Sequence, residues 1–273
     1  MASSSESIID SKQSSEKQQQ QQQPKYRLHI YDHCPYCIRV ELAFGWRNVH
    51  YERVLYGYGD RLGDESEKMI NNPNTYDTGV VLTGKKELPV LEKINEYGNR
   101  EWLKAESLDT IEWLEEHHHQ QQQGDKYQPK SNRNDLKEFF KSTGRFKVVQ
   151  RLITRPRMMK NMIHLKDWLK PKDRAYAIAK YESQGFDYTK AEAGDKESID
   201  EMKILLEECC LLLLKSDTSF YENGILGWDD LLYLQELRTL SLVNEEDLIW
   251  PERLKNYVVL AFAKANNVPT YFK

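Results

Sequence analysis

The chemistry of this chain centres on two cysteines separated by two residues, in the run Cys34-Pro35-Tyr36-Cys37. They follow a strand-like run at 27–32 and open a helical run at 38–44. Proline suits the first turn of a helix, because its missing N–H would have no partner there. We therefore expect Cys34 at the N-cap, where free N–H groups and the helix dipole favour the reactive thiolate. Cys37 lies one turn deeper, so the pair predicts a redox-active dithiol for thiol–disulfide exchange.

A second group with chemical meaning is Glu106-Ser107-Leu108-Asp109. Ser107 is a natural N-cap and Asp109 suits a first helical turn, so by itself the motif only marks the start of a helix. The free helix N–H groups and the Ser107 hydroxyl can also hold a carboxylate, while the Glu106 carboxylate holds an ammonium group. A γ-glutamyl group carries both charges on one carbon. Downstream of the C-x-x-C run, the motif therefore predicts a site for the γ-glutamyl head of glutathione.

Residues 24–116 alternate strand and helix signals in the order βαβ and then ββα, which is typical of a thioredoxin-like α/β unit. The predicted strands are 28–31, 50–56 and 88–92, with a hairpin turn at 96–99, and the predicted helices are 36–47 and 107–116. In thioredoxin-like folds the start of the third strand holds a cis-proline that faces the reactive cysteine. Only about one X–Pro bond in twenty is cis, but here we predict a cis Leu88–Pro89 bond. The backbone of Leu88 would then pair with an extended peptide.

The rest of the chain is predominantly helical, with helices predicted at 134–152, 165–181, 196–215, 228–242 and 253–266. An α/β domain followed by an all-α domain is the layout of glutathione transferases. The predicted domains are a disordered Gln-rich tail at 1–23, a thioredoxin-like domain at 24–116, a His/Gln-rich linker at 117–130 and a helical domain at 131–273.

The composition of the chain argues against two classes of protein, nucleic-acid-binding proteins and membrane-spanning proteins. The net charge of −4 gives no electrostatic footprint for nucleic acid, and no apolar run approaches the length of a membrane span. The start of the chain has neither a signal core nor a transit-peptide pattern, which predicts a cytoplasmic protein.

The adjacent Cys209 and Cys210 follow a helical apolar stripe and are interpreted as core. His117 to His119 sit in a glutamine-rich tract and are interpreted as linker, so no metal site is predicted.

Three of these segments together resemble the glutaredoxin 2 family, the large glutaredoxins with a helical, transferase-like second domain. They are the run 31–37, the run 88–91 and the run 106–109, and the similarity continues at 237–243 and 249–251. The resemblance covers about residues 26–260. It implies a monomeric glutathione-dependent enzyme with Cys34 and Cys37 as catalytic residues. It also implies a glutathione site made by Tyr36, Leu88, Pro89, Glu106 and Ser107.

The predicted function is therefore a glutaredoxin that reduces protein–glutathione mixed disulfides and other disulfides. Glutathione is a co-substrate, no cofactor is bound permanently, and the partners are glutathione and glutathionylated or disulfide-containing proteins. One alternative is a glutathione transferase or dehydroascorbate reductase that uses Cys34 alone. A non-enzymatic alternative is iron–sulfur cluster binding through Cys34, or an interaction protein that acts through its glutamine tracts.

Several residues keep open interpretations. The segment 57–87 is longer than its family equivalent, so the ligands of the glycyl carboxylate of glutathione are undefined; Arg39, Lys85 and Lys86 are candidates, or plain surface charges. Asp32 and His33 flank Cys34 and can tune its pKa, in a direction that the sequence does not define. Four arginines early in the helical region either form a solvated face or border a cleft between the domains: Arg145, Arg151, Arg155 and Arg157.

Overall fold

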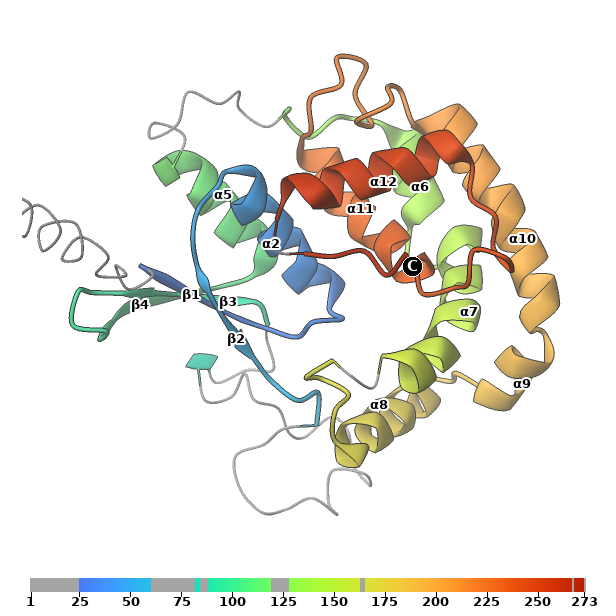
Figure 1. Cartoon of the computed structure of the whole chain (residues 1–273), viewed down its shortest axis with the longest axis horizontal. Coiled ribbons are helices and arrows are strands. Elements are labelled where there is room, and N and C mark those ends of the chain that lie inside the picture. Colours follow the sequence, from blue (N-terminus) through green and yellow to red (C-terminus); the bar gives the residue numbers. More distant parts are fainter. Residues whose placement is uncertain are drawn as a thin grey trace, which may run out of the picture.

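The chain folds into a small sheet region followed by a larger group of helices (Figure 1). The computed structural model describes residues 25–59, 82–83, 88–118, 128–162, 165–266 and 268–272. The Gln-rich tail predicted at 1–23 and most of the predicted linker lie outside these residues. So does most of the long segment between the second and third strands. The predicted fold class, a thioredoxin-like sheet domain joined to a glutathione-transferase-like helical region, is confirmed.

The sheet has four strands in the order β2-β1-β3-β4. Strand β1 (Tyr26–Ile30) pairs in parallel with β2 (Glu52–Leu55) and antiparallel with β3 (Val90–Ile94), which pairs antiparallel with β4 (Arg100–Ala105). Helix α2 (Pro35–Trp46) follows β1, and α5 (Ser107–His118) follows β4. The two helices lie side by side next to the sheet (Figure 1). This order places the end of β1 and the start of α2, where the two cysteines lie, at the edge that faces the helical region.

The helical region contains α6 to α12 and one π-helical turn, η1. Their bounds are α6 (Asn134–Phe140), α7 (Arg145–Asn161), α8 (Pro171–Ser183), α9 (Tyr188–Ala193), α10 (Asp195–Glu208), η1 (Cys209–Leu213), α11 (Trp228–Leu240) and α12 (Glu252–Lys264). Within the described parts of the chain, none of the helices combines the length and the apolar character that a membrane span needs.

Two predicted helices differ from the observed ones. The run 134–152 is broken into α6 and α7, because Gly144 is the extended N-cap of a new helix that continues to Asn161. The helix predicted from residue 165 begins only at Pro171, where proline occupies the first turn. The stripe that contains Cys209 is confirmed as core: Ile199, Met202, Leu205, Leu206, Cys209 and Leu213 are all buried.

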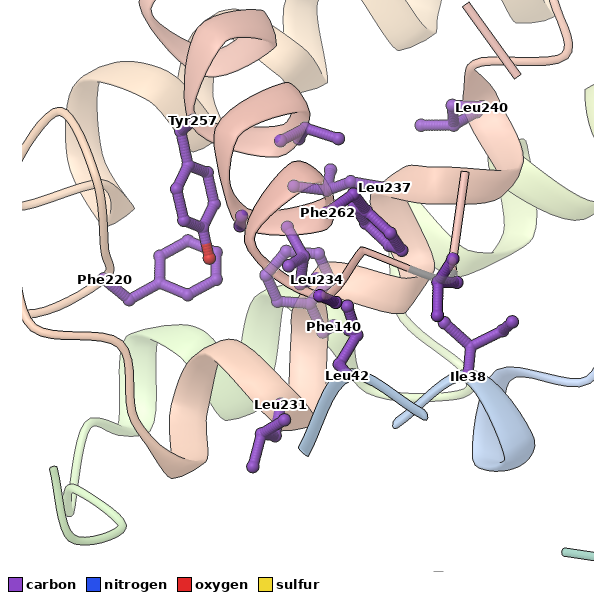
Figure 2. Packing of buried hydrophobic residues seen from close by; sticks show 14 of the residues in the cluster. Ile38, Leu42, Phe140, Phe220, Leu231, Leu234, Leu237, Leu240, Tyr257 and Phe262 are labelled. Carbon is purple, nitrogen blue, oxygen red and sulfur yellow. The ribbon is translucent and has the colours of Figure 1, made fainter. Parts of the chain in front are cut away.

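One hydrophobic core runs through both regions (Figure 2). Ile38 and Leu42 of α2 point toward the leucine face of α11, and Phe262 of α12 lies beside them. The indole Nε1 of Trp46 donates a hydrogen bond to the carbonyl oxygen of Ala261 at 2.8 Å. The helix that carries the cysteines is therefore held in place by α11 and α12 as well as by its own sheet.

Gly45 marks the closest approach of α2 to the end of α12. A Cβ atom at this position would lie 2.3 Å from the carbonyl oxygen of Ala265 and 2.6 Å from its Cα. Replacing a glycine inside a helix by alanine normally stabilises a protein by about 1 kcal/mol. Here we expect Gly45→Ala to destabilise the protein by about 1–3 kcal/mol, because backbone atoms must move apart. Chemical denaturation measures this change. Gly194→Ala is the control, since its nearest atom is 3.6 Å away, and an equal loss in both variants would contradict the close approach.

Candidate active site

Cys34 is the N-cap of α2, as predicted. Its backbone is extended, and Pro35 is the first helical residue. The carbonyl of Cys34 accepts the first helical hydrogen bond, from the N–H of Ile38 at 3.0 Å. Its side chain is half-buried at the mouth of a cleft, whereas Cys37 is fully buried one turn below. The helix therefore presents one accessible sulfur and keeps the second behind it.

The two thiols have pKa values that move in opposite directions. A hydrogen bond from the Cys37 thiol, the charge of His33 and the N–H groups of Tyr36 and Cys37 lower the pKa of Cys34 from 9.0 to about 7, against the effect of burial. Burial and the neighbouring Cys34 raise the pKa of Cys37 well above its ordinary value. Near neutral pH the pair therefore holds a thiolate at Cys34 and a thiol at Cys37, which is the state required of a nucleophile with a resolving partner.

This difference predicts the pH dependence of Cys34 reactivity. The thiol form of Cys34 is unreactive, so its alkylation by iodoacetamide should rise with pH around a midpoint near 7 and then level off. The rate is measured by mass spectrometry of reduced protein between pH 5 and 9.5. A midpoint near 9 would contradict the proposed stabilisation of the thiolate. The Cys34→Ser variant is the control and should remain unalkylated at pH 7, because Cys37 is buried.

His33 is held by a carboxylate from the helical region. Asp167 lies in the segment before α8 and is completely buried. Its Oδ2 accepts a hydrogen bond from the backbone N–H of His33 at 2.8 Å and a second from the imidazole Nδ1 of His33. The imidazole packs against Trp168, with ring centroids 4.3 Å apart. The buried carboxylate of Asp167 therefore fixes the imidazole of His33 beside Cys34, where the charge of His33 lowers the pKa of the Cys34 thiol.

Replacing Asp167 by asparagine should therefore raise the pKa of Cys34. Asparagine can still accept the backbone hydrogen bond, but its amide carries no charge to pair with the imidazole of His33, whose charge lowers the pKa of Cys34. We expect the alkylation midpoint to move from about 7 toward the ordinary thiol value and the rate at pH 6.5 to fall severalfold, with little change at pH 9. Asp173→Asn, a second buried aspartate on the neighbouring helix α8, is the matched control. An unchanged midpoint in Asp167→Asn would remove Asp167 from this role.

The cleft above Cys34 has a volume of about 680 Å³. Cys34, Tyr36, Arg39 and Leu88 line its sheet-domain side, and residues of α7, α8 and α11 line the other side. Tyr36 is 56 % exposed, with the Arg39 guanidinium 5.4 Å from its ring centroid. The cleft therefore brings the predicted residues Cys34, Tyr36 and Leu88 together between the two regions.

The predicted γ-glutamyl site lies beside this cleft. Ser107 is buried and is the first residue of α5 rather than a cap before it, so the carbonyl of Glu106 accepts the hydrogen bond from Thr110. Arg39, which is buried and not a plain surface charge, donates to the Ser107 hydroxyl at 3.4 Å. Glu106 is exposed and adopts a left-handed φ of 66°, a conformation that is uncommon for glutamate and concentrates at binding sites. The arrangement offers a base, a hydroxyl and a carboxylate within one corner.

The Leu88–Pro89 bond, which precedes β3, is cis, as predicted. Leu88 lines the cleft, whereas Pro89 is buried behind it. Lys85 and Lys86 lie outside the described residues. Across the described ranges, no three His, Cys, Asp or Glu side chains are grouped as metal ligands.

Sequence reasoning missed the residues that come from the helical region. Asp167 is 134 positions from His33 and belongs to no motif, so only the fold brings the two together. Arg151 and Arg155, for which the sequence left open a solvated face or the border of a cleft between the domains, both line the cleft. Arg145 and Arg157 do not line it: they pair with Glu201 and Asp195.

The chain is similar in sequence to known proteins. Residues 28–122 match the family model described as glutathione S-transferase, N-terminal domain. Glutaredoxin 2 of Escherichia coli (strain K12) is 24 % identical over 231 residues, which cover 85 % of this chain and 91 % of that protein.

Two solved structures share the fold. Glutaredoxin 2 from Salmonella typhimurium, in complex with glutathione, matches with a TM-score of 0.69 at 20 % identity, over 90 % of this chain and 96 % of that one. Glutathione S-transferase III in its apo form matches with a TM-score of 0.51 at 12 % identity, over 89 % and 97 %. The predicted resemblance to glutaredoxin 2 is thereby confirmed, and the chain has a glutathione-transferase-like fold.

Proposed function

We propose that this protein is a glutathione-dependent thiol–disulfide oxidoreductase of the glutaredoxin type, with Cys34 as nucleophile and Cys37 as resolving thiol. The observation that carries the proposal is the sulfur pair itself. Cys34 lies at the cleft mouth with a pKa of about 7, and the Cys37 thiol donates to it from the buried side. As part of the proposal, glutathione is a co-substrate and the enzyme acts as a cytoplasmic monomer.

Glutathione is the proposed electron donor because the corner beside Cys34 suits its charges. Arg39 and Ser107 can bind the α-carboxylate of the γ-glutamyl group, and Glu106 can bind its ammonium group. The polar backbone of Leu88 next to the cleft can pair with the cysteinyl peptide groups. A related solved structure, glutaredoxin 2 from Salmonella typhimurium, is described as a complex with glutathione.

The proposed reaction has two routes, which both begin with attack of the Cys34 thiolate on a sulfur of the substrate disulfide. With a glutathione mixed disulfide, Cys34 attacks the glutathione sulfur, forms a Cys34–glutathione disulfide and releases the substrate thiolate; with a protein disulfide, it forms a Cys34–protein disulfide and releases the other protein thiolate. A second glutathione thiolate then attacks the bound glutathione sulfur, which releases glutathione disulfide and restores Cys34. With a protein disulfide as substrate, Cys37 displaces the bound protein from Cys34, and the resulting Cys34–Cys37 disulfide is reduced by two glutathione molecules.

A glutathione transferase is the second candidate, because the family model that matches residues 28–122 describes a transferase domain. The buried Cys37 favours the oxidoreductase, since conjugation needs no resolving thiol.

Two assays on the wild-type protein separate the candidates. One measures glutathione-coupled reduction of the mixed disulfide of glutathione and mercaptoethanol, and the other measures conjugation of glutathione to 1-chloro-2,4-dinitrobenzene. We expect turnover in the first and none above background in the second. Conjugation without disulfide reduction would overturn the proposal in favour of the transferase.

A further inference from the structure

The cleft has a helical wall whose charge is opposite to that of the whole chain. The chain carries a net charge of −4. The Lys, Arg, Asp and Glu side chains that line the cleft are five bases and one acid: Arg39, Lys147, Arg151, Arg155, Lys180 and Glu236. Three of the bases, at 147, 151 and 155, follow each other at four-residue intervals along α7 and so share one face. Like charges at this spacing destabilise a helix, so helix stability does not explain the stripe.

Arg151 and Arg155, called here the cationic wall, have no carboxylate partner among the residues that the structure describes. Lys147, by contrast, forms an ion pair with Glu236. Arg151 donates to the carbonyl oxygen of Ser142 at 3.0 Å, and the Arg155 guanidinium lies 4.1 Å from the ring centroid of Tyr181. Neither contact neutralises a charge.

Partial burial makes a negative partner favourable for Arg155. Burial lowers the pKa of Arg155, and the nearby charge of Arg151 acts in the same direction. A carboxylate beside the guanidinium would oppose both effects and could bind it through two parallel hydrogen bonds. The cationic wall therefore has the properties of a site for carboxylates.

The direction of disulfide attack shows which part of a substrate meets this wall. In displacement at sulfur, the attacking and leaving sulfurs lie on opposite sides of the sulfur under attack. When glutathione is held beside Ser107 and Arg39, the leaving cysteine of the substrate lies on the side of the glutathione sulfur away from Cys34. Because α7, α8 and α11 form the other wall of the cleft, residues that flank that cysteine can reach α7.

We propose that the cationic wall binds acidic residues that flank the glutathionylated cysteine of a protein substrate. This inference rests on the proposed function and names its substrate class. The chemistry is unchanged: the Cys34 thiolate displaces the substrate thiolate, which takes up a proton, and a second glutathione then releases Cys34 as thiolate and leaves as glutathione disulfide. Overall one disulfide is consumed and one is formed, with glutathione as the reductant of the substrate sulfur, and the wall contributes binding only.

Three glutathionylated peptides of equal length test the proposal, with the cysteine flanked by glutamates, glutamines or lysines. Each is assayed for kcat/KM with glutathione at low and at high ionic strength. For the wild type we expect the acidic peptide to exceed the neutral one by about tenfold at low ionic strength and the lysine peptide to be poorest. Salt should reduce the preference to about twofold, because exposed charges are screened.

The variants Arg151→Gln, Arg155→Gln and their combination should each weaken this preference, and the double variant should abolish it. Arg145→Gln is the matched control, because Arg145 is on the same helix but pairs with Glu201 outside the cleft. It should retain the full preference. Melting temperatures show whether each variant is folded. If Arg155→Gln is unstable, the test relies on Arg151→Gln, because Arg151 is half-exposed at one end of the wall.

Three results would overturn the inference. The first is equal kcat/KM for acidic and neutral peptides in the wild type. The second is a preference that survives in the double variant. The third is a double variant whose only change is a higher KM for glutathione, which would assign the arginines to the carboxylates of glutathione. Failure of the wild type to reduce any of the three peptides would overturn the proposed function and this inference together.

Discussion

Cys34→Ser should lose all glutathione-coupled reduction of both mixed disulfides and protein disulfides. A hydroxyl is not ionised near neutral pH and does not attack sulfur, so the introduced serine cannot replace the Cys34 thiolate. Cys37 is buried and its pKa is raised. Turnover should therefore fall to the uncatalysed level, as measured by the glutathione-coupled assay.

Cys210→Ala is the control for this loss. Cys210 is a buried cysteine in the π-helical turn, within the core of the helical region, so its variant should retain wild-type turnover. Activity retained by Cys34→Ser would contradict the assignment of the nucleophile.

Two variants of Cys37 separate its roles. Cys37→Ser should still reduce glutathione mixed disulfides but not protein disulfides, because the first reaction is completed by a second glutathione and the second needs a resolving thiol. The serine hydroxyl can also replace the hydrogen bond that lowers the pKa of Cys34. Cys37→Ala removes that donor, so it should additionally move the alkylation midpoint of Cys34 upward from about 7. Identical pH profiles for the two variants would show that this hydrogen bond is unimportant.

Asp230→Ala should lower the free energy of unfolding by about 3–4 kcal/mol. This is the largest loss of stability that we expect from a single substitution of a buried residue. The Asp230 carboxylate is completely buried at the start of α11. It accepts four hydrogen bonds, from the backbone N–H groups of Phe220 and Gly227 and the hydroxyls of Ser219 and Tyr257. Alanine leaves all four donors buried without this partner, and α11 carries the leucines that pack against α2 (Figure 2).

Chemical denaturation followed by tryptophan fluorescence measures this loss. Asp200→Ala is the control, since Asp200 is an exposed residue of α10 with a surface ion pair to Lys203, and the unfolding midpoint of this variant should hardly change. If Asp230→Ala unfolded at the same denaturant concentration as the control, the four hydrogen bonds would not organise the helical region.

The fold could be predicted largely because local signals agreed with one another. A strand, the C-x-x-C run and a helix occur in the order that places Cys34 at an N-cap, and Leu88–Pro89 directly precedes the third strand, β3. Gly227 is the N-cap of α11, a position where serine or threonine is also favoured. The structure explains the glycine: a Cβ there would lie 2.6 Å from the carbonyl oxygen of Gln128, while Asp230 accepts the Gly227 N–H.

The far side of the site could not be predicted in the same way. Asp167 reaches His33 only because the segment before α8 folds against the end of β1, which is a tertiary contact without a local pattern. Arg39 could not be distinguished from a surface base in the sequence, because its position on α2 does not reveal that α11 and α5 bury its side chain. The break between α6 and α7 was missed because Phe139, Phe140 and Phe146 continue the apolar pattern across it.

The most direct test of the central claim is to observe the Cys34–glutathione disulfide. Purified Cys37→Ser protein is mixed with glutathione disulfide, and intact mass and peptide mass are then measured before and after addition of reduced glutathione. The account predicts the addition of one glutathionyl group, located on Cys34, and its removal by reduced glutathione with the appearance of glutathione disulfide. No adduct, or an adduct on Cys209 or Cys210 instead of Cys34, would contradict it.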